Sequence, residues 1–210
     1  MHTLTEQQIA TMFAGSRAIA LDIETTGLKP DTSDIIELGM AEFVDGVETR
    51  QNSALYGGGS SPQVAINVHH IEDKDRVGLK TFGESTEHLR KYLAHEIPDP
   101  KTRRGIKETI LIGHNLVKFD IPFICSVAKR AGFPIMCRDG YVSVVDTLSI
   151  SRKHLSSPDF KLQTLCQVYG IDHGGHRGLG DALSSWHVLL TVMETVGIAH
   201  VSSLVERYTL

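Results

Sequence analysis

Cysteine is scarce in this sequence, and the three cysteines present, Cys125, Cys137 and Cys166, form no CxxC pair. An odd number of widely spaced cysteines favours neither a disulfide framework nor a zinc knuckle. The sequence also lacks an apolar run long enough to cross a membrane, and its N-terminus lacks the apolar core of a signal peptide. These absences predict a soluble protein of a reducing compartment, which we expect to be the cytoplasm.

The chain has no excess of positive charge, because 25 acidic residues outnumber 21 lysines and arginines and give a formal net charge of −4. A protein that coats long stretches of duplex is normally basic, since phosphate contacts drive its affinity. The balance here suits a small site that grips a few phosphates with the help of bound cations. A length of 210 residues with 41% hydrophobic residues suits one domain with a core.

The hydrophobic pattern predicts strands and helices in a mixed order. Strands are expected at 18–22, 35–44, from 47, at 110–112 and at 142–145, and helices at 84–95, 121–132, 147–153, 161–169 and 181–196. Asp45-Gly46 between two strand-like runs predicts an antiparallel hairpin. We expect an α/β fold in which a mixed five-stranded sheet, with the first strand central and strands two and three as the hairpin, is flanked by helices.

The domain boundaries follow from the same pattern. Residues 1–16 are expected to form an N-terminal helical extension, because Thr5 and Gln8 resemble a capping box. Residues 17–196 would be the main domain, and residues 197–210 a short C-terminal tail.

Two carboxylates stand at the end of the first predicted strand, in Asp22-Ile23-Glu24. Residues two apart on a strand point to the same side, so these carboxylates converge. Converging carboxylates repel each other, and a divalent cation relieves that repulsion. A solvated strand end with two acids would have the same sequence, so the pair alone does not decide between the two.

The residues that follow, Thr25-Thr26-Gly27-Leu28, suit contact with the end of a strand of nucleic acid. Gly27 permits a tight exit from the strand and leaves backbone N–H groups beside the carboxylates, where they can hold a hydroxyl or a phosphate oxygen. Leu28 offers an apolar edge to a terminal base. An ordinary turn between strand and loop would also fit.

Two later blocks carry further acids and histidines. Asp120 ends a block that begins with Gly113-His114 and lies near the start of a predicted helix. Asp181 begins the last long helix, with His176 on the glycine-bearing loop before it. Each aspartate alone could simply cap a helix. A doubly flanked sheet, however, gathers its functional residues at strand ends and helix starts.

Taken together, DIETTGL, GHNLVKFD and HRGLGDA resemble the three motifs of the DnaQ-like exonucleases, in the branch called DEDDh after four acids and a histidine. The resemblance covers residues 17–196 and implies a ribonuclease H-like fold and 3′→5′ exonuclease activity. His176 stands five positions before Asp181, as in the histidine branch, and Arg177 takes the place of the tyrosine of the other branch. The second motif is one residue longer than in many members and is similar to the TREX-type spacing.

The resemblance implies a metal site and a general base. Two divalent cations, Mg²⁺ or Mn²⁺, would be held by Asp22, Glu24, Asp120 and Asp181, and oxygen-only ligands suit these ions. His176 would accept a proton from the attacking water. The residues expected to bind the terminal nucleotide are Thr25, Thr26, Gly27, Leu28, His69, Asn115 and Phe119.

The expected substrate is the 3′ end of single-stranded DNA, cleaved to nucleoside 5′-monophosphates. Ribonuclease T and oligoribonuclease resemble the same motifs, so trimming of RNA 3′ ends is the alternative that a comparison of DNA with RNA would separate. A non-catalytic nucleic-acid-binding module is a further alternative, which metal-dependent release of nucleotides would exclude. A polymerase or repair partner and a homodimer both remain open, and no membrane partner is expected.

Overall fold

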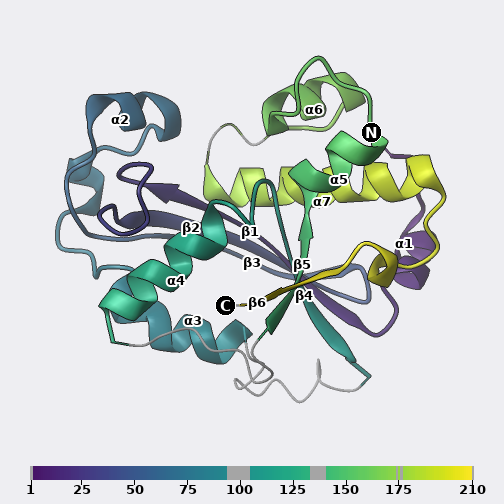
Figure 1. The fold of residues 1–210 in the computed structure, drawn as a ribbon, viewed down its shortest axis with the longest axis horizontal. Coiled ribbons are helices and arrows are strands. Elements are labelled where there is room, and N and C mark those ends of the chain that lie inside the picture. The colour runs from purple at the N-terminus through teal and green to yellow at the C-terminus, as the bar shows by residue number, and fades with distance from the viewer. Residues whose placement is uncertain (1, 94–104, 133–140, 174, 176, 210) are drawn as a thin grey trace.

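The protein consists of a central sheet with helices on both faces (Figure 1). The structure, a computed structural model, describes residues 2–93, 105–132, 141–173, 175 and 177–209. Its six strands lie in the order β3-β2-β1-β4-β5-β6. Helices α5 and α7 cover one face of the sheet, with α6 packed on α7, and α3 and α4 lie on the other face (Figure 1). None of the described helices is both long and apolar enough to cross a membrane.

The first three strands form an antiparallel unit, as the sequence predicts. They are β1 (Ser16–Thr25), β2 (Ile35–Val44) and β3 (Val47–Leu55). The β2–β3 turn places Asp45 at φ 50° and Gly46 at φ 75°, the two positive values that a type I′ turn needs. β1 runs three residues beyond its predicted end at Asp22, so Asp22 and Glu24 lie within the strand.

The other half of the sheet consists of β4, β5 and β6. The third of these strands was not expected, so the sheet has six strands instead of five. β4 (Glu108–Gly113) pairs parallel to β1, and β5 (Tyr141–Asp146) pairs parallel to β4. β6 (Glu206–Thr209) comes from the segment predicted to be a tail, and it pairs antiparallel to β5. Its four residues are mostly polar and carry no apolar alternation, so only the free edge of β5 reveals them as a strand.

The helices agree largely with the predicted positions. They are α1 (Glu6–Met12), α2 (Gln63–His69), α3 (Thr86–Leu93), α4 (Asp120–Arg130), α5 (Thr147–His154), α6 (Leu162–Tyr169) and α7 (Gly178–Val196), with 3₁₀ turns η1 (Asp73–Arg76), η2 (Gly83–Ser85) and η3 (Val201–Ser203). The capping box of α1 is present, with the Thr5 side chain bound to the Gln8 backbone. The short helix α2 was not predicted, because its seven residues give too weak a period.

The start of α7 differs from the prediction in a way that matters for the site. The helix begins at Gly178, so Asp181 is its fourth residue rather than its first. Arg177, with extended backbone, is the N-cap residue, and the Gly178 N–H donates to the buried carboxylate of Glu37 at 3.1 Å. A side chain from a distant strand therefore caps this helix, which no local pattern could reveal.

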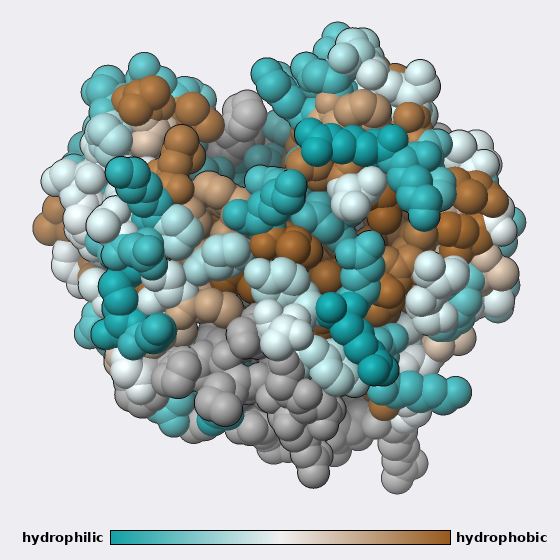
Figure 2. Space-filling model, in the orientation of Figure 1, coloured by the Kyte–Doolittle hydropathy of each residue, from teal (hydrophilic) through white to brown (hydrophobic). Residues whose placement is uncertain are grey.

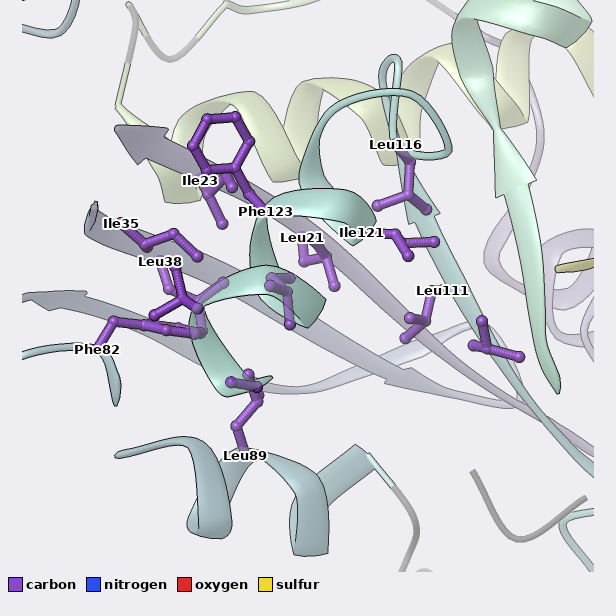
Figure 3. Close-up of a cluster of buried hydrophobic side chains, with 14 of the residues drawn as sticks. Leu21, Ile23, Ile35, Leu38, Phe82, Leu89, Leu111, Leu116, Ile121 and Phe123 are labelled. Atoms are coloured by element: carbon purple, nitrogen blue, oxygen red, sulfur yellow. The ribbon is translucent and has the colours of Figure 1, made fainter. Parts of the chain in front are cut away.

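Strand β1 has two very different faces. Ile19, Leu21 and Ile23 point toward α3 and α4 and belong to a cluster of large aliphatic and aromatic side chains (Figure 3). Ala18 and Ala20 point to the other face and pack under α7. Because side chains alternate along a strand, Asp22 and Glu24 continue the alanine face. The small residues let α7 lie close to the strand next to the two acids.

Helix α7 is fixed to the sheet by its aromatic anchor and by a close glycine contact. The Trp186 ring stacks on Phe43 of β2 with centroids 3.8 Å apart. At the start of the helix, a Cβ on Gly39 of β2 would lie 1.9 Å from the Leu179 backbone nitrogen. Only a residue without a side chain permits this approach, so Gly39 sets how near Asp181 comes to β1.

We expect Gly39→Ala to displace the start of α7 and to lower the free energy of unfolding by about 1–3 kcal/mol or more, the range for overpacked interiors. Urea denaturation measures the loss. Gly59→Ala is the matched control, because its Cβ would meet only the Asp34 side chain, at 3.3 Å. Equal stabilities for the two variants would contradict this account of the helix contact.

Candidate active site

Three carboxylates from two distant segments meet between β1 and α7. Oxygen atoms of Asp22, Glu24 and Asp181 all lie within 4.8 Å of one another. Asp22 and Glu24 are half-buried, and Asp181 is buried. The carboxyl end of β1 lies between α2 and the start of α7 (Figure 1), and the surface in the same view is hollowed between the lobes of α2 and α6 (Figure 2).

Asp120 joins this cluster from the opposite side of β1. It is the first residue of α4 and is 2% exposed. Its Oδ1 accepts a hydrogen bond of 3.2 Å from the Ile23 N–H, between the two acids of β1. The structure thus brings together the four acids that the motifs singled out. The sequence placed Asp120 at or near a helix cap, and the structure places it one residue inside.

The electrostatics of the cluster reflect this crowding. Burial, followed by the charges of Asp120, Glu24 and Asp181, raises the pKa of Asp22 well above its usual range. Burial and the charge of Asp181 raise the pKa of Glu24 to about 8. Burial also raises the pKa of Asp120 to about 8, although the hydrogen bond from Ile23 opposes the shift. The four groups cannot all ionise at neutral pH without a compensating positive charge.

The donor set fits a divalent cation with a preference for oxygen. In the part of the chain that the structure describes, Asp22, Glu24 and Asp181 are the group of potential ligands that approach one another closely, and each offers a carboxylate oxygen. Mg²⁺ and Mn²⁺ prefer such ligands, whereas Zn²⁺ is more often held by histidine and cysteine. The site can therefore hold a hard cation at the end of β1.

Glu37 organises the site without belonging to the ligand group. It lies opposite Glu24 in the β1–β2 register and is 0% exposed. The Arg177 guanidinium donates to it from Nε at 3.0 Å and from Nη2 at 2.9 Å, and the Ser53 hydroxyl donates at 2.9 Å. Burial would raise the pKa of Glu37, but these bonds and the one from Gly178 hold it below its usual range. The sequence offered one sign of this role, because Glu37 interrupts an otherwise apolar run, Ile35-Ile36-Glu37-Leu38.

Asp146, at the end of β5, likewise holds a segment of the site in place without belonging to the ligand group. Its carboxylate accepts hydrogen bonds from the N–H groups of Asn115 at 3.1 Å and Val117 at 3.0 Å, and it caps α5 through Leu148. Asn115 lies at φ 67°, in the left-handed region. The loop that leads to Asp120 is therefore held by a side chain from β5. Nothing in the local sequence around Asp146 indicates this role.

The loop after β1 is closed on itself. The Thr25 hydroxyl donates to the Gly27 carbonyl at 2.7 Å, and Thr26 exchanges two hydrogen bonds of 2.9 Å with Asp34. We expected the backbone N–H groups of this turn to be free for a substrate, but the Thr26 N–H already donates to the Asp34 carbonyl. Leu28 at the tip is 83% exposed, the free apolar edge that the sequence predicts.

The remaining predicted substrate contacts lie in different environments. His69, at the end of α2, is 2% exposed. Burial lowers the pKa of His69, and its Nδ1 accepts a 3.0 Å hydrogen bond from Ile71. Phe119 packs on Phe123 with ring centroids 4.8 Å apart. His176, the expected general base, lies outside the described residues.

The arrangement of the sheet and the position of the acids define a ribonuclease H-like nuclease fold. The structure resembles Escherichia coli exonuclease I in complex with a dT13 oligonucleotide, with a TM-score of 0.71, 14% identity and 87% of this chain covered. It covers 42% of that protein's chain. The likeness confirms the predicted fold class.

The family follows from the sequence. Residues 19–189 match the family model described as Exonuclease, RNase_T. The chain is 32% identical over 185 residues to the DNA polymerase III subunit epsilon of Rickettsia felis, covering 83% of this chain and 74% of that protein. It is 30% identical over 200 residues to the PolC-type DNA polymerase III of Caldanaerobacter subterraneus, covering 89% and 12%. The chain belongs to this exonuclease family, which confirms its assignment to the DnaQ-like 3′→5′ exonucleases.

We expect the metal-free protein to lose stability as the pH rises from about 4, the ordinary carboxyl pKa, through about 8, because the folded chain must then release protons that relieve repulsion. Mg²⁺ should therefore raise the melting temperature more at about pH 9 than at about pH 6. If Mg²⁺ removes about 1 kcal/mol of repulsion, the melting temperature should rise by roughly 2–4 °C for a protein of this size.

Thermal denaturation with EDTA or with Mg²⁺ measures this difference. Glu24→Gln serves as the comparison, because it removes one of the titrating charges and should flatten the pH dependence of the metal-free protein. A melting temperature that rises with pH across this window in EDTA would contradict the electrostatic description of the cluster.

Proposed function

We propose that the chain hydrolyses single-stranded DNA from its 3′ end and releases nucleoside 5′-monophosphates. The observation that supports this most directly is the convergence of Asp22, Glu24 and Asp181 within 4.8 Å, with Asp120 bonded to the same strand. The loop that carries the exposed Leu28 follows directly from this strand. A cation site beside such a loop suits cleavage of a terminal phosphodiester.

Asp22, Glu24 and Asp181 would hold one divalent cation, and Asp22 with Asp120 a second. Mg²⁺ or Mn²⁺ fits the carboxylate donors. When bound, the cations supply Lewis-acid stabilisation of the charge on the phosphate and favour ionisation of the attacking water. Glu37 and Asp146 keep the ligands in place, through the start of α7 and the loop before α4 respectively.

We assign the proton transfer to His176. A histidine can accept a proton near neutral pH, and it must be neutral to do so, so activity should rise with pH through its titration. The motif places this histidine one residue before Arg177, whose Nε and Nη2 donate hydrogen bonds to the carboxylate of Glu37. The backbone next to the base is therefore anchored to β2.

The choice of DNA and of a polymerase partner is supported by the relatives. Several are subunits or forms of bacterial DNA polymerase III, and a structural neighbour carries a DNA oligonucleotide. We therefore place the activity in proofreading or repair beside a polymerase, in the cytoplasm. A homodimer stays a prediction that nothing yet tests.

We expect mononucleotide release from a 3′-labelled linear DNA strand in the presence of Mg²⁺, and none in EDTA. A circular strand of the same sequence should survive, because the site requires a terminus. Asp181→Asn is the control for a contaminating nuclease and should lose most of the activity. Equal cleavage of circular and linear strands would overturn the assignment of an end-specific enzyme.

The same assay with an RNA strand of matching sequence separates the substrate classes. Faster loss of RNA than of DNA would replace the DNA assignment by RNA 3′-end trimming. Strand binding without nucleotide release under any divalent cation would indicate a binding module.

We expect His176→Ala to bind a DNA strand as the wild type does but to turn over roughly 10²–10⁴-fold more slowly, the usual contribution of a general base. Single-turnover kinetics measures the rate, and fluorescence anisotropy in Ca²⁺ measures binding. His154→Ala, from the end of α5, is a matched control. Wild-type turnover by the His176 variant would remove it from the mechanism.

A further inference from the structure

A histidine lies beside Asp181, one of the proposed cation ligands. The Nε2 atom of His173 is 3.2 Å from Oδ1 of Asp181, and the two side chains are only 15% and 12% exposed. His173 precedes Asp181 by eight residues and stands outside the three motifs. The motifs therefore give no reason for an imidazole to face this carboxylate.

The backbone near His173 decides which ring nitrogen carries the proton. The Gly175 N–H donates to Nδ1 at 3.1 Å, so Nδ1 must present its lone pair. In the neutral ring the proton then resides on Nε2, the nitrogen that faces Asp181. This tautomer turns the Nε2–H group of His173 toward Asp181. A cation ligand would need the lone pair on Nε2 instead.

The segment that carries His173 is held at its base by both neighbouring helices. The Ile171 N–H donates to the Cys166 carbonyl of α6 at 2.8 Å, and the Ser184 hydroxyl of α7 lies 3.5 Å from the Asp172 carbonyl. Ile171 itself is buried in a small cluster with Leu165 and Val188. The imidazole is thus placed by the packing of α6 on α7.

We propose that His173 is a positioning residue, which orients the carboxylate of Asp181 toward Asp22 and Glu24 and thereby raises the affinity of the cluster for a divalent cation. The inference rests on the cation site of the proposed function. Side chains that contact a metal ligand without binding the metal themselves typically contribute roughly 10–100-fold to metal affinity. His173 makes no contact with the substrate in this role.

Calorimetric titration of the metal-stripped, full-length protein with Mn²⁺ tests the proposal without reference to nuclease activity. We expect His173→Ala to weaken Mn²⁺ binding by roughly 10–100-fold. His173→Gln should recover part of the affinity, because its amide can donate to Asp181. His88→Ala, an exposed histidine on α3, should bind as the wild type does.

Nitrogen-15 NMR of the wild-type protein provides a measurement that survives any folding defect of the variants. The His173 ring should show a protonated Nε2 and an unprotonated Nδ1, both before and after Mg²⁺ is added. Unchanged Mn²⁺ affinity in His173→Ala, a glutamine variant as weak as the alanine variant, or loss of the Nε2 proton on metal binding would each overturn the proposal.

The outcomes also separate this inference from the proposed function. A wild-type protein that binds Mn²⁺ and degrades DNA, alongside an alanine variant of equal affinity, would refute only the role of His173. A wild-type protein that neither binds Mn²⁺ nor degrades DNA would refute the proposed function itself, and the positioning role with it.

Discussion

The mutual repulsion of four carboxylates in one half-buried place is the constraint on which the rest of this structure depends. Burial and neighbouring charges raise the pKa values of Asp22, Glu24 and Asp120, so the metal-free cluster is held together against its own electrostatics. The packing of α7 on β1 and β2 provides that restraint. Functional sites commonly hold such strained groups on rigid elements.

The restraint is built from small residues and from buried polar anchors. Ala18, Ala20 and Gly39 leave room for α7 to approach the sheet, and Trp186 stacked on Phe43 fixes the helix along its length. At its start, Glu37 binds both the Gly178 N–H and the Arg177 side chain. A buried carboxylate is costly unless its oxygens are bonded, and here several donors satisfy it.

The exonuclease unit is similar to parts of proteins that differ greatly in length. The chain covers 74% of an epsilon subunit, 42% of exonuclease I and 12% of a PolC-type polymerase. The family model matches residues 19–189 of this chain. Within this range, the described residues form a hydrophobic core on each face of the sheet and carry all four acids.

The sequence by itself determined the strands β1 to β5, most helices and the identity of the acids, because these depend on local periodicity and on motif spacing. Asp22 and Glu24 share a face simply because strands alternate. The sequence did not reveal β6, whose polar residues become a strand only at the edge of β5. Nor did it reveal the anchoring roles of Glu37 and Asp146, or the contact of His173 with Asp181. Each of these joins residues from different elements, so it depends on how the strands and helices pack in three dimensions, which no local pattern encodes.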